Sequence, residues 1–135
     1  MTPARAYQRT QTETATPERL LVMLMARARS CMRTAHEQLV ANKEADEGTL
    51  QRAVDIVAEL NATLDHRPAP ELARNLSDVY VFVLHRLTRA MRGDKVALSE
   101  AMRAFFPIAE GFEQAISGRV VASAVPSPVT SAVIK

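Results

Sequence analysis

Tryptophan is absent from this chain of 135 residues, and other aromatic residues are scarce, with two tyrosines and four phenylalanines. Glycine occurs only four times and never in a cluster, so the sequence lacks the glycine-rich loop that cradles phosphate groups. Alanine, leucine, methionine, arginine and glutamate carry the pattern instead, and these residues favour helices over strands. The composition therefore predicts an all-α fold of one domain.

Long apolar runs are also missing. The longest, Leu20 to Ala26, falls far short of the ~18 residues that span a bilayer. Residues 1–16 contain no apolar stretch of the kind that a secretory signal needs, and the single Cys31 cannot form an internal disulfide. We expect a cytoplasmic protein without membrane insertion.

The residue groupings of common catalytic and metal sites are absent as well. His36 and Glu37 begin like a zinc-protease HExxH motif, but Val40 stands where the second histidine belongs. Cys31 has no second cysteine to complete a CxxC pair. We expect no enzyme activity, no metal and no cofactor.

Charge gives little support to nucleic-acid binding. The chain has 17 Lys and Arg against 15 Asp and Glu, a net charge of +2. Arg27, Arg29 and Arg33 are the main concentration of cations, but helical spacing places only Arg29 and Arg33 on one face. Since phosphate recognition needs cations gathered on one face, we expect no nucleic-acid partner.

Helix start and stop signals divide the chain into four segments. Thr16, Pro17 and Glu18 combine an N-cap, an N1 proline and a first-turn acid. Gly93 offers a left-handed stop, and Asp94 caps the segment that follows. Apolar residues at three- and four-residue steps predict helices over residues 17–42, 49–65, 70–91 and 94–116.

Short loops between long amphipathic helices are typical of an antiparallel four-helix bundle. We expect this bundle over residues 17–116, between a flexible N-terminal arm (1–16) and a disordered C-terminal tail (117–135). Pro107 lies inside the last helix and predicts a kink there, because proline removes a backbone hydrogen bond.

Two asparagines interrupt the apolar stripes of the second and third helices. An antiparallel register places Leu60 beside Leu76 and Asn61 beside Asn75, so the two amides meet in one layer. Buried amides need hydrogen-bond partners. Either they bond each other and fix the register of the hairpin, or they line a groove and bond the main chain of a bound peptide. Both interpretations stay open.

The third helix carries more apolar residues than one buried stripe needs. Residues 79–84 read VYVFVL and cover the whole circumference of a helix. Neighbouring helices enclose this segment, or part of it is an exposed surface for a partner, or it closes on a second copy in a homodimer.

Four stretches in one order resemble the flagellar secretion chaperone (FliS) family, whose members hold flagellin before export. They are AYQRTQ at 6–11, TATPERLLVML at 14–24, DIVAELNATLD at 55–65, and ELARNL at 71–76 running into Tyr80. The resemblance implies an antiparallel helical bundle that binds the disordered C-terminal segment of flagellin without a cofactor, and releases it at the export gate. The chain departs from the family pattern at Met25 and Ala26, where a Tyr-Asp pair is usual, and at Phe112, where tryptophan is common.

The family's peptide surface draws mainly on the second and third helices. Carried over residue by residue, the resemblance implies these partner-binding positions: Ile56, Leu60, Asn61, Leu64, Leu72, Asn75, Leu76, Tyr80 and Val83. It also implies that Tyr7, in the N-terminal arm, is a displaceable lid over this surface.

Two functions of other classes remain as alternatives. One is a small helical regulatory or nucleic-acid-binding protein that uses Arg29 and Arg33, and the other is a self-associating structural module. Salt dependence separates the first from a chaperone, because phosphate binding weakens steeply with salt and apolar binding does not.

Overall fold

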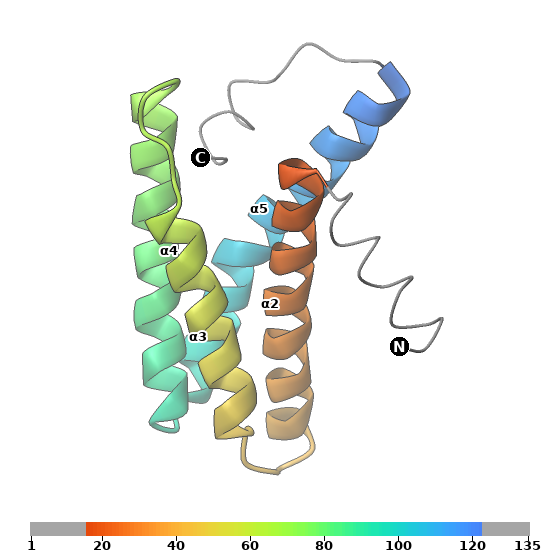
Figure 1. Ribbon diagram of the computed structural model, residues 1–135. Coiled ribbons are helices and arrows are strands. Elements are labelled where there is room, and N and C mark those ends of the chain that lie inside the picture. The colour runs from red at the N-terminus through yellow and green to blue at the C-terminus, as the bar shows by residue number, and fades with distance from the viewer. Residues whose placement is uncertain (1–15, 123–135) are drawn as a thin grey trace, which may run out of the picture.

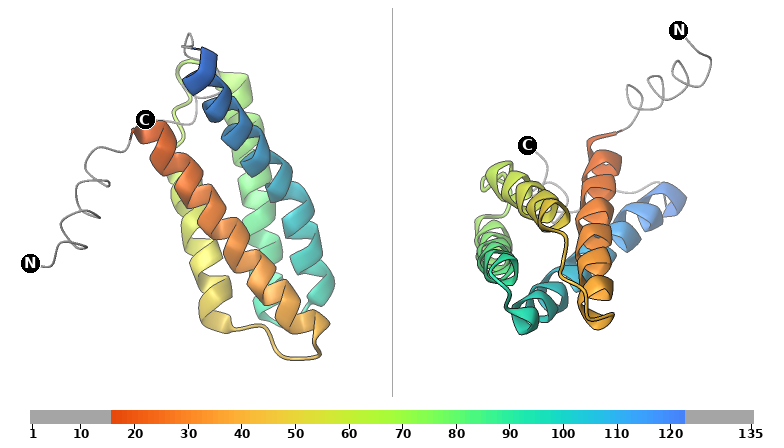
Figure 2. Two further views of the ribbon diagram at one scale, coloured as in Figure 1. Left: turned by 90° about the vertical axis from the view of Figure 1, so that its right-hand side faces the viewer. Right: turned by 90° about the horizontal axis from the view of Figure 1, so that it is seen from below.

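The structure is a computed structural model that describes residues 16–122. This part of the chain forms four α-helices and no strand: α2 (Pro17–Val40), α3 (Glu47–Ala62), α4 (Pro70–Met91) and α5 (Lys95–Ala122). Each helix runs antiparallel to the next, and α5 packs against both α4 and α2, which closes the bundle (Figure 1, Figure 2). The predicted all-α, antiparallel four-helix bundle is confirmed.

Local capping explains where the helices begin. The Thr16 hydroxyl accepts a hydrogen bond from the Arg19 amide at 3.1 Å, and the Asp94 carboxylate accepts one from the Ala97 amide at 3.1 Å. These bonds satisfy backbone donors that have no partner inside the helix. The predicted starts of the first and last helices are therefore confirmed, and α4 covers the predicted residues 70–91.

The boundaries of α3 differ from the prediction. The helix begins at Glu47, two residues before the predicted Thr49, because Asp46 caps it: the Asp46 carboxylate accepts hydrogen bonds from both the amide (3.0 Å) and the hydroxyl (2.7 Å) of Thr49. The Gln38 side chain accepts a hydrogen bond from the Asp46 amide at 2.8 Å and ties this cap to α2. The helix ends at Ala62, three residues before the predicted Asp65.

The last helix is longer than predicted. It continues through Pro107 as one element and ends at Ala122, six residues beyond the predicted Ile116. Phe105 and Ala109 are buried on either side of Pro107, so both turns are held against the core. Residues 117–122 of the predicted tail are thus helical, whereas residues 123–135 and the arm residues 1–15, with Tyr7, lie outside the described part.

The core lies along the bundle axis and takes side chains from all four helices. Its largest fully buried members are Tyr80, Phe105, Met25, Met32, Leu50, Leu60, Leu87, Leu98, Val57 and Val83. Gly93 adopts a φ of 101° in the α4–α5 turn, which confirms the predicted left-handed stop. Within residues 16–122, no helix has both the length and the apolarity that crossing a membrane requires.

Candidate functional site

Five of the nine predicted partner-binding positions between Ile56 and Val83 belong to the core. Their side chains are buried between the helices, as the exposed fractions of at most 7% show for Leu60, Leu64, Leu76, Tyr80 and Val83. These residues hold α3 and α4 against α2 and α5, so their side chains contribute little to the surface of the closed bundle. The sequence pattern identified the apolar stripes correctly, but it did not show that these five residues pack inside the bundle and not on its surface.

The remaining predicted positions are accessible, but they do not share one surface. Ile56, Asn61 and Leu72 are half-buried, and Asn75 is exposed. Asn61 lies on the side of α3 that faces α4, whereas Ile56 lies about 140° away around the same helix. A single furrow between α3 and α4 therefore does not collect them.

Asn61 bonds a residue that the sequence argument did not consider. Its Oδ1 accepts a hydrogen bond from the Ser77 hydroxyl at 2.8 Å, which links α3 to α4. Residues 75 and 77 differ by about 200° around a helix, so when Ser77 faces α3, Asn75 is turned away from it. The predicted asparagine layer is wrong, and the register bond is between Asn61 and Ser77. The sequence did contain a signal for this bond, because Ser77 is a second polar residue on the same helix, two positions after Asn75.

The six-residue apolar run of α4 is enclosed on one side only. Tyr80 and Val83 are buried, whereas 54% of Val81 and 39% of Phe82 are exposed. The Arg86 guanidinium lies 5.0 Å from the centre of the Phe82 ring, and its Nε is 3.8 Å from the Glu100 carboxylate on α5. The outer side of α4 therefore presents an apolar surface with a cation stacked on it.

Tyr80 has an unusual environment for a polar group. Its side chain is fully buried, and its hydroxyl has no hydrogen-bond partner among the described residues. Burial raises the pKa of this hydroxyl well above its ordinary value, because the low-dielectric interior disfavours the phenolate. A neutral, unpaired hydroxyl thus sits in the centre of the bundle at a cost in stability.

A second apolar surface lies on the first turns of α2. Leu21 and Met25 are buried, but Leu20 (39%), Met23 (57%) and Leu24 (38%) are exposed. Their spacing of three and four residues places Leu20, Met23 and Leu24 on one face of the helix. We refer to these three residues as the α2 patch. It lies on the flank of α2 that faces α3, opposite the flank that carries the ion pair to α5.

Two arginines of α2 contact α5. Arg29 lies 3.6 Å from Glu113, and the Arg33 guanidinium lies 5.6 Å from the centre of the Phe106 ring. Both partners are on α5, so these cations are not gathered for phosphate contacts. This arrangement weighs against the nucleic-acid alternative.

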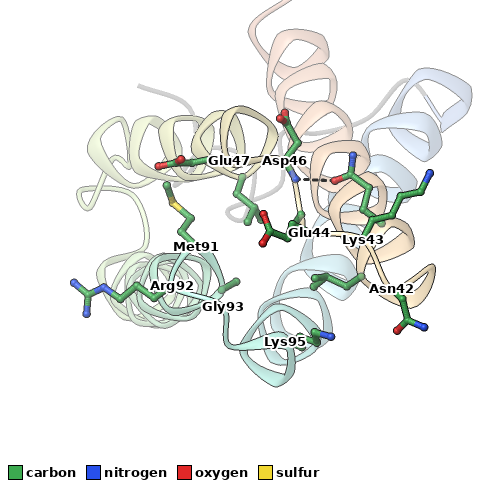
Figure 3. Close-up of a pocket in the computed structure, with 14 residues that line it drawn as sticks. Asn42, Lys43, Glu44, Asp46, Glu47, Met91, Arg92, Gly93 and Lys95 are labelled. Carbon is green, nitrogen blue, oxygen red and sulfur yellow. Dashed lines mark hydrogen bonds between the residues drawn. The ribbon is translucent and has the colours of Figure 1, made fainter.

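The opposite end of the bundle holds a pocket of about 760 Å³ (Figure 3). Glu44, Asp46 and Glu47 border it from the α2–α3 connection, and Met91 and Arg92 border it from the end of α4. These three acids are balanced by the three bases Lys43, Arg92 and Lys95, so the pocket has no strong net charge of one sign. Among residues 16–122, no group of three His, Cys, Asp or Glu side chains gathers as a metal site.

Two comparisons place the sequence among known proteins. The family profile "Flagellar protein FliS" matches residues 1–119. The chain is also 34% identical over 121 residues to the flagellar secretion chaperone FliS of Salmonella typhimurium, an alignment that covers 82% of this chain and 87% of that protein.

Proposed function

This chain belongs to the FliS family of flagellar secretion chaperones, and on that premise we propose that it binds the disordered C-terminal segment of flagellin. Binding keeps the segment from polymerising prematurely and delivers it to the flagellar type III export apparatus. The function needs a surface for a peptide and no bond-breaking step, so we propose a binding protein of the cytoplasm, without a cofactor.

One observation supports this proposal most directly. The bundle fills its own core and still exposes large apolar side chains, among them the α2 patch and the neighbouring pair Val81 and Phe82 on α4. Exposed apolar clusters on small proteins commonly mark interaction sites. Because α2 and α4 lie diagonally across the bundle, a partner that covers both must wrap around it, as a disordered segment can.

The predicted site residues divide into two roles in this proposal. Ile56, Asn61, Leu72 and Asn75 are accessible and contact the bound segment directly. The buried positions act through the packing that fixes α3 and α4. The arm with Tyr7 is a lid that the partner displaces. A contact with a component of the export gate and a homodimer remain predictions.

Calorimetric titration of the full chain with the C-terminal segment of its cognate flagellin tests the proposal. We expect binding that changes little with salt, because apolar contacts dominate it. Met23→Ser combined with Phe82→Ser should weaken binding at least about tenfold, the effect of losing a buried apolar anchor.

Val96→Ser is the matched control, since Val96 is an equally apolar and 68% exposed side chain at the other end of the bundle. Its affinity should equal that of the unaltered protein. Undetectable binding by the unaltered, folded chain would reject the proposal. An equal loss in the Val96 variant would show that the surface lies elsewhere.

A further inference from the structure

The α2 patch lies beside the end of the bundle from which the rest of the chain continues. Arg29 of α2 lies 3.6 Å from Glu113 of α5, so these two positions of the antiparallel helices are at a similar height in the bundle. Figure 1 shows the first turns of α2 and the last turns of α5 at the same end, opposite the α2–α3 connection. Residues 123–135 follow α5, whose last turns extend past the start of α2 and lean away from it in Figure 1, so the segment starts at the same end of the bundle as the patch.

We propose that the segment 123–135 folds back over this end of the bundle and covers the α2 patch. The inference does not rest on flagellin binding, since it concerns the chain without a partner. It also concerns residues beyond those that the family profile matches, which end at residue 119.

The length of the segment suffices for this contact. Thirteen residues in an extended, polyproline-like conformation span about 40 Å, whereas Leu20 to Leu24 covers only about 6 Å of helix. Pro126 and Pro128 favour such an extended conformation over a helix. The segment can therefore pass around α2 from its α5 side to its α3 side.

The composition of the segment matches an apolar surface. Its large side chains are Val125, Val129, Val133 and Ile134, and its only charged side chain is Lys135. Covering the patch with it removes apolar area from water on both partners and desolvates no internal charge.

The other end of the chain is a poorer candidate for the same patch. Residues 1–15 carry three charged side chains, Arg5, Arg9 and Glu13, and are otherwise rich in threonine and glutamine. Placing these groups against Leu20, Met23 and Leu24 would require desolvating them without a described partner. The chemistry therefore favours residues 123–135.

A nitroxide spin label on the segment tests the proposal directly. Ser131→Cys in a Cys31→Ala background carries the label, and ¹³C-labelled methionine methyl groups report its position. We expect the Met23 signal to lose most of its intensity, whereas Met91, beside the pocket at the opposite end (Figure 3), keeps its intensity. Adding Val129→Ser, Val133→Ser and Ile134→Ser preserves the length of the segment and should restore the Met23 signal.

A second measurement covers the case in which the Cys31 variant does not fold, because Cys31 is buried. Ending the unlabelled chain after Ala122 should shift the Met23 methyl resonance and leave Met91 unchanged. An unaltered Met23 in both measurements overturns the proposal. So does a shift that follows deletion of residues 1–15 instead, or broadening that arises only between labelled and unlabelled molecules, which would identify a second copy as the occupant.

Discussion

Replacing Tyr80 with phenylalanine should stabilise the free protein. The ring is fully buried, and its hydroxyl has no hydrogen-bond partner among the described residues. Leaving a buried polar group unpaired costs about 1–3 kcal/mol, and phenylalanine retains the ring while removing that group. We expect the free energy of unfolding to rise by about 1 kcal/mol, which corresponds to roughly 4 °C in melting temperature for a domain of this size.

Urea denaturation followed by circular dichroism measures the change. The midpoint should increase, and the slope of free energy against urea should stay constant, because the surface exposed on unfolding is nearly unchanged. Phe105→Tyr is the matched control, since it adds a hydroxyl to an equally buried ring and should destabilise the bundle. A loss of stability in Tyr80→Phe would show that the hydroxyl has a partner in solution, such as a buried water molecule.

The pH dependence gives an independent check on the same group. Burial raises the pKa of Tyr80 in the folded state, so the folded protein keeps this proton when the unfolded chain loses it. Titration of Tyr80 therefore leaves the free energy of unfolding unchanged below the ordinary tyrosine pKa and lowers it as pH rises above that value, from about pH 10 upward. Stability of the unaltered protein should fall more steeply in this range than that of Tyr80→Phe. Parallel slopes would contradict the raised pKa.

Four further outcomes follow from the described contacts and the proposed lid. Ser77→Ala removes the hydroxyl that donates to Asn61, so urea denaturation should show a loss of about 1 kcal/mol; an unchanged midpoint would mean that this bond does not contribute. Asn61→Leu should keep the bundle folded and weaken binding of the flagellin segment, and equal affinities in calorimetry would exclude a contact through the amide. Hydrogen bonds from Thr49 lower the pKa of Asp46, so the ionised carboxylate stabilises the fold above the ordinary carboxyl pKa, and this stabilisation is lost as pH falls below that value toward the lowered pKa. Asp46→Asn retains a capping side chain that does not titrate. Acid titration followed by circular dichroism should therefore show that this variant loses less stability than the unaltered protein between neutral pH and about pH 2. Deleting residues 1–12 removes Tyr7 and should increase affinity for flagellin, whereas a decrease would refute the lid.

The helices themselves were predictable because their signals are local. A capping side chain bonds an amide three residues away, as at Thr16 and Asp94, and a proline at the first position of a helix needs no partner elsewhere. The spacing of apolar residues then identified the stripe that each helix buries. These features predicted the antiparallel bundle, and the combination of four short motifs indicated its family.

The candidate site depended on information that no local signal carries. Whether Asn61 meets Asn75 or Ser77, and whether Tyr80 or Phe82 faces the interior, depends on how far each helix rotates about its own axis. That rotation is a compromise among the packing contacts with both neighbouring helices, and a shift of one residue turns a side chain by about 100°. The sequence alone therefore determined that the chain forms four amphipathic helices with more apolar residues than the core needs. Only the tertiary structure decided which of them stay exposed, among them the α2 patch and the pair Val81 and Phe82.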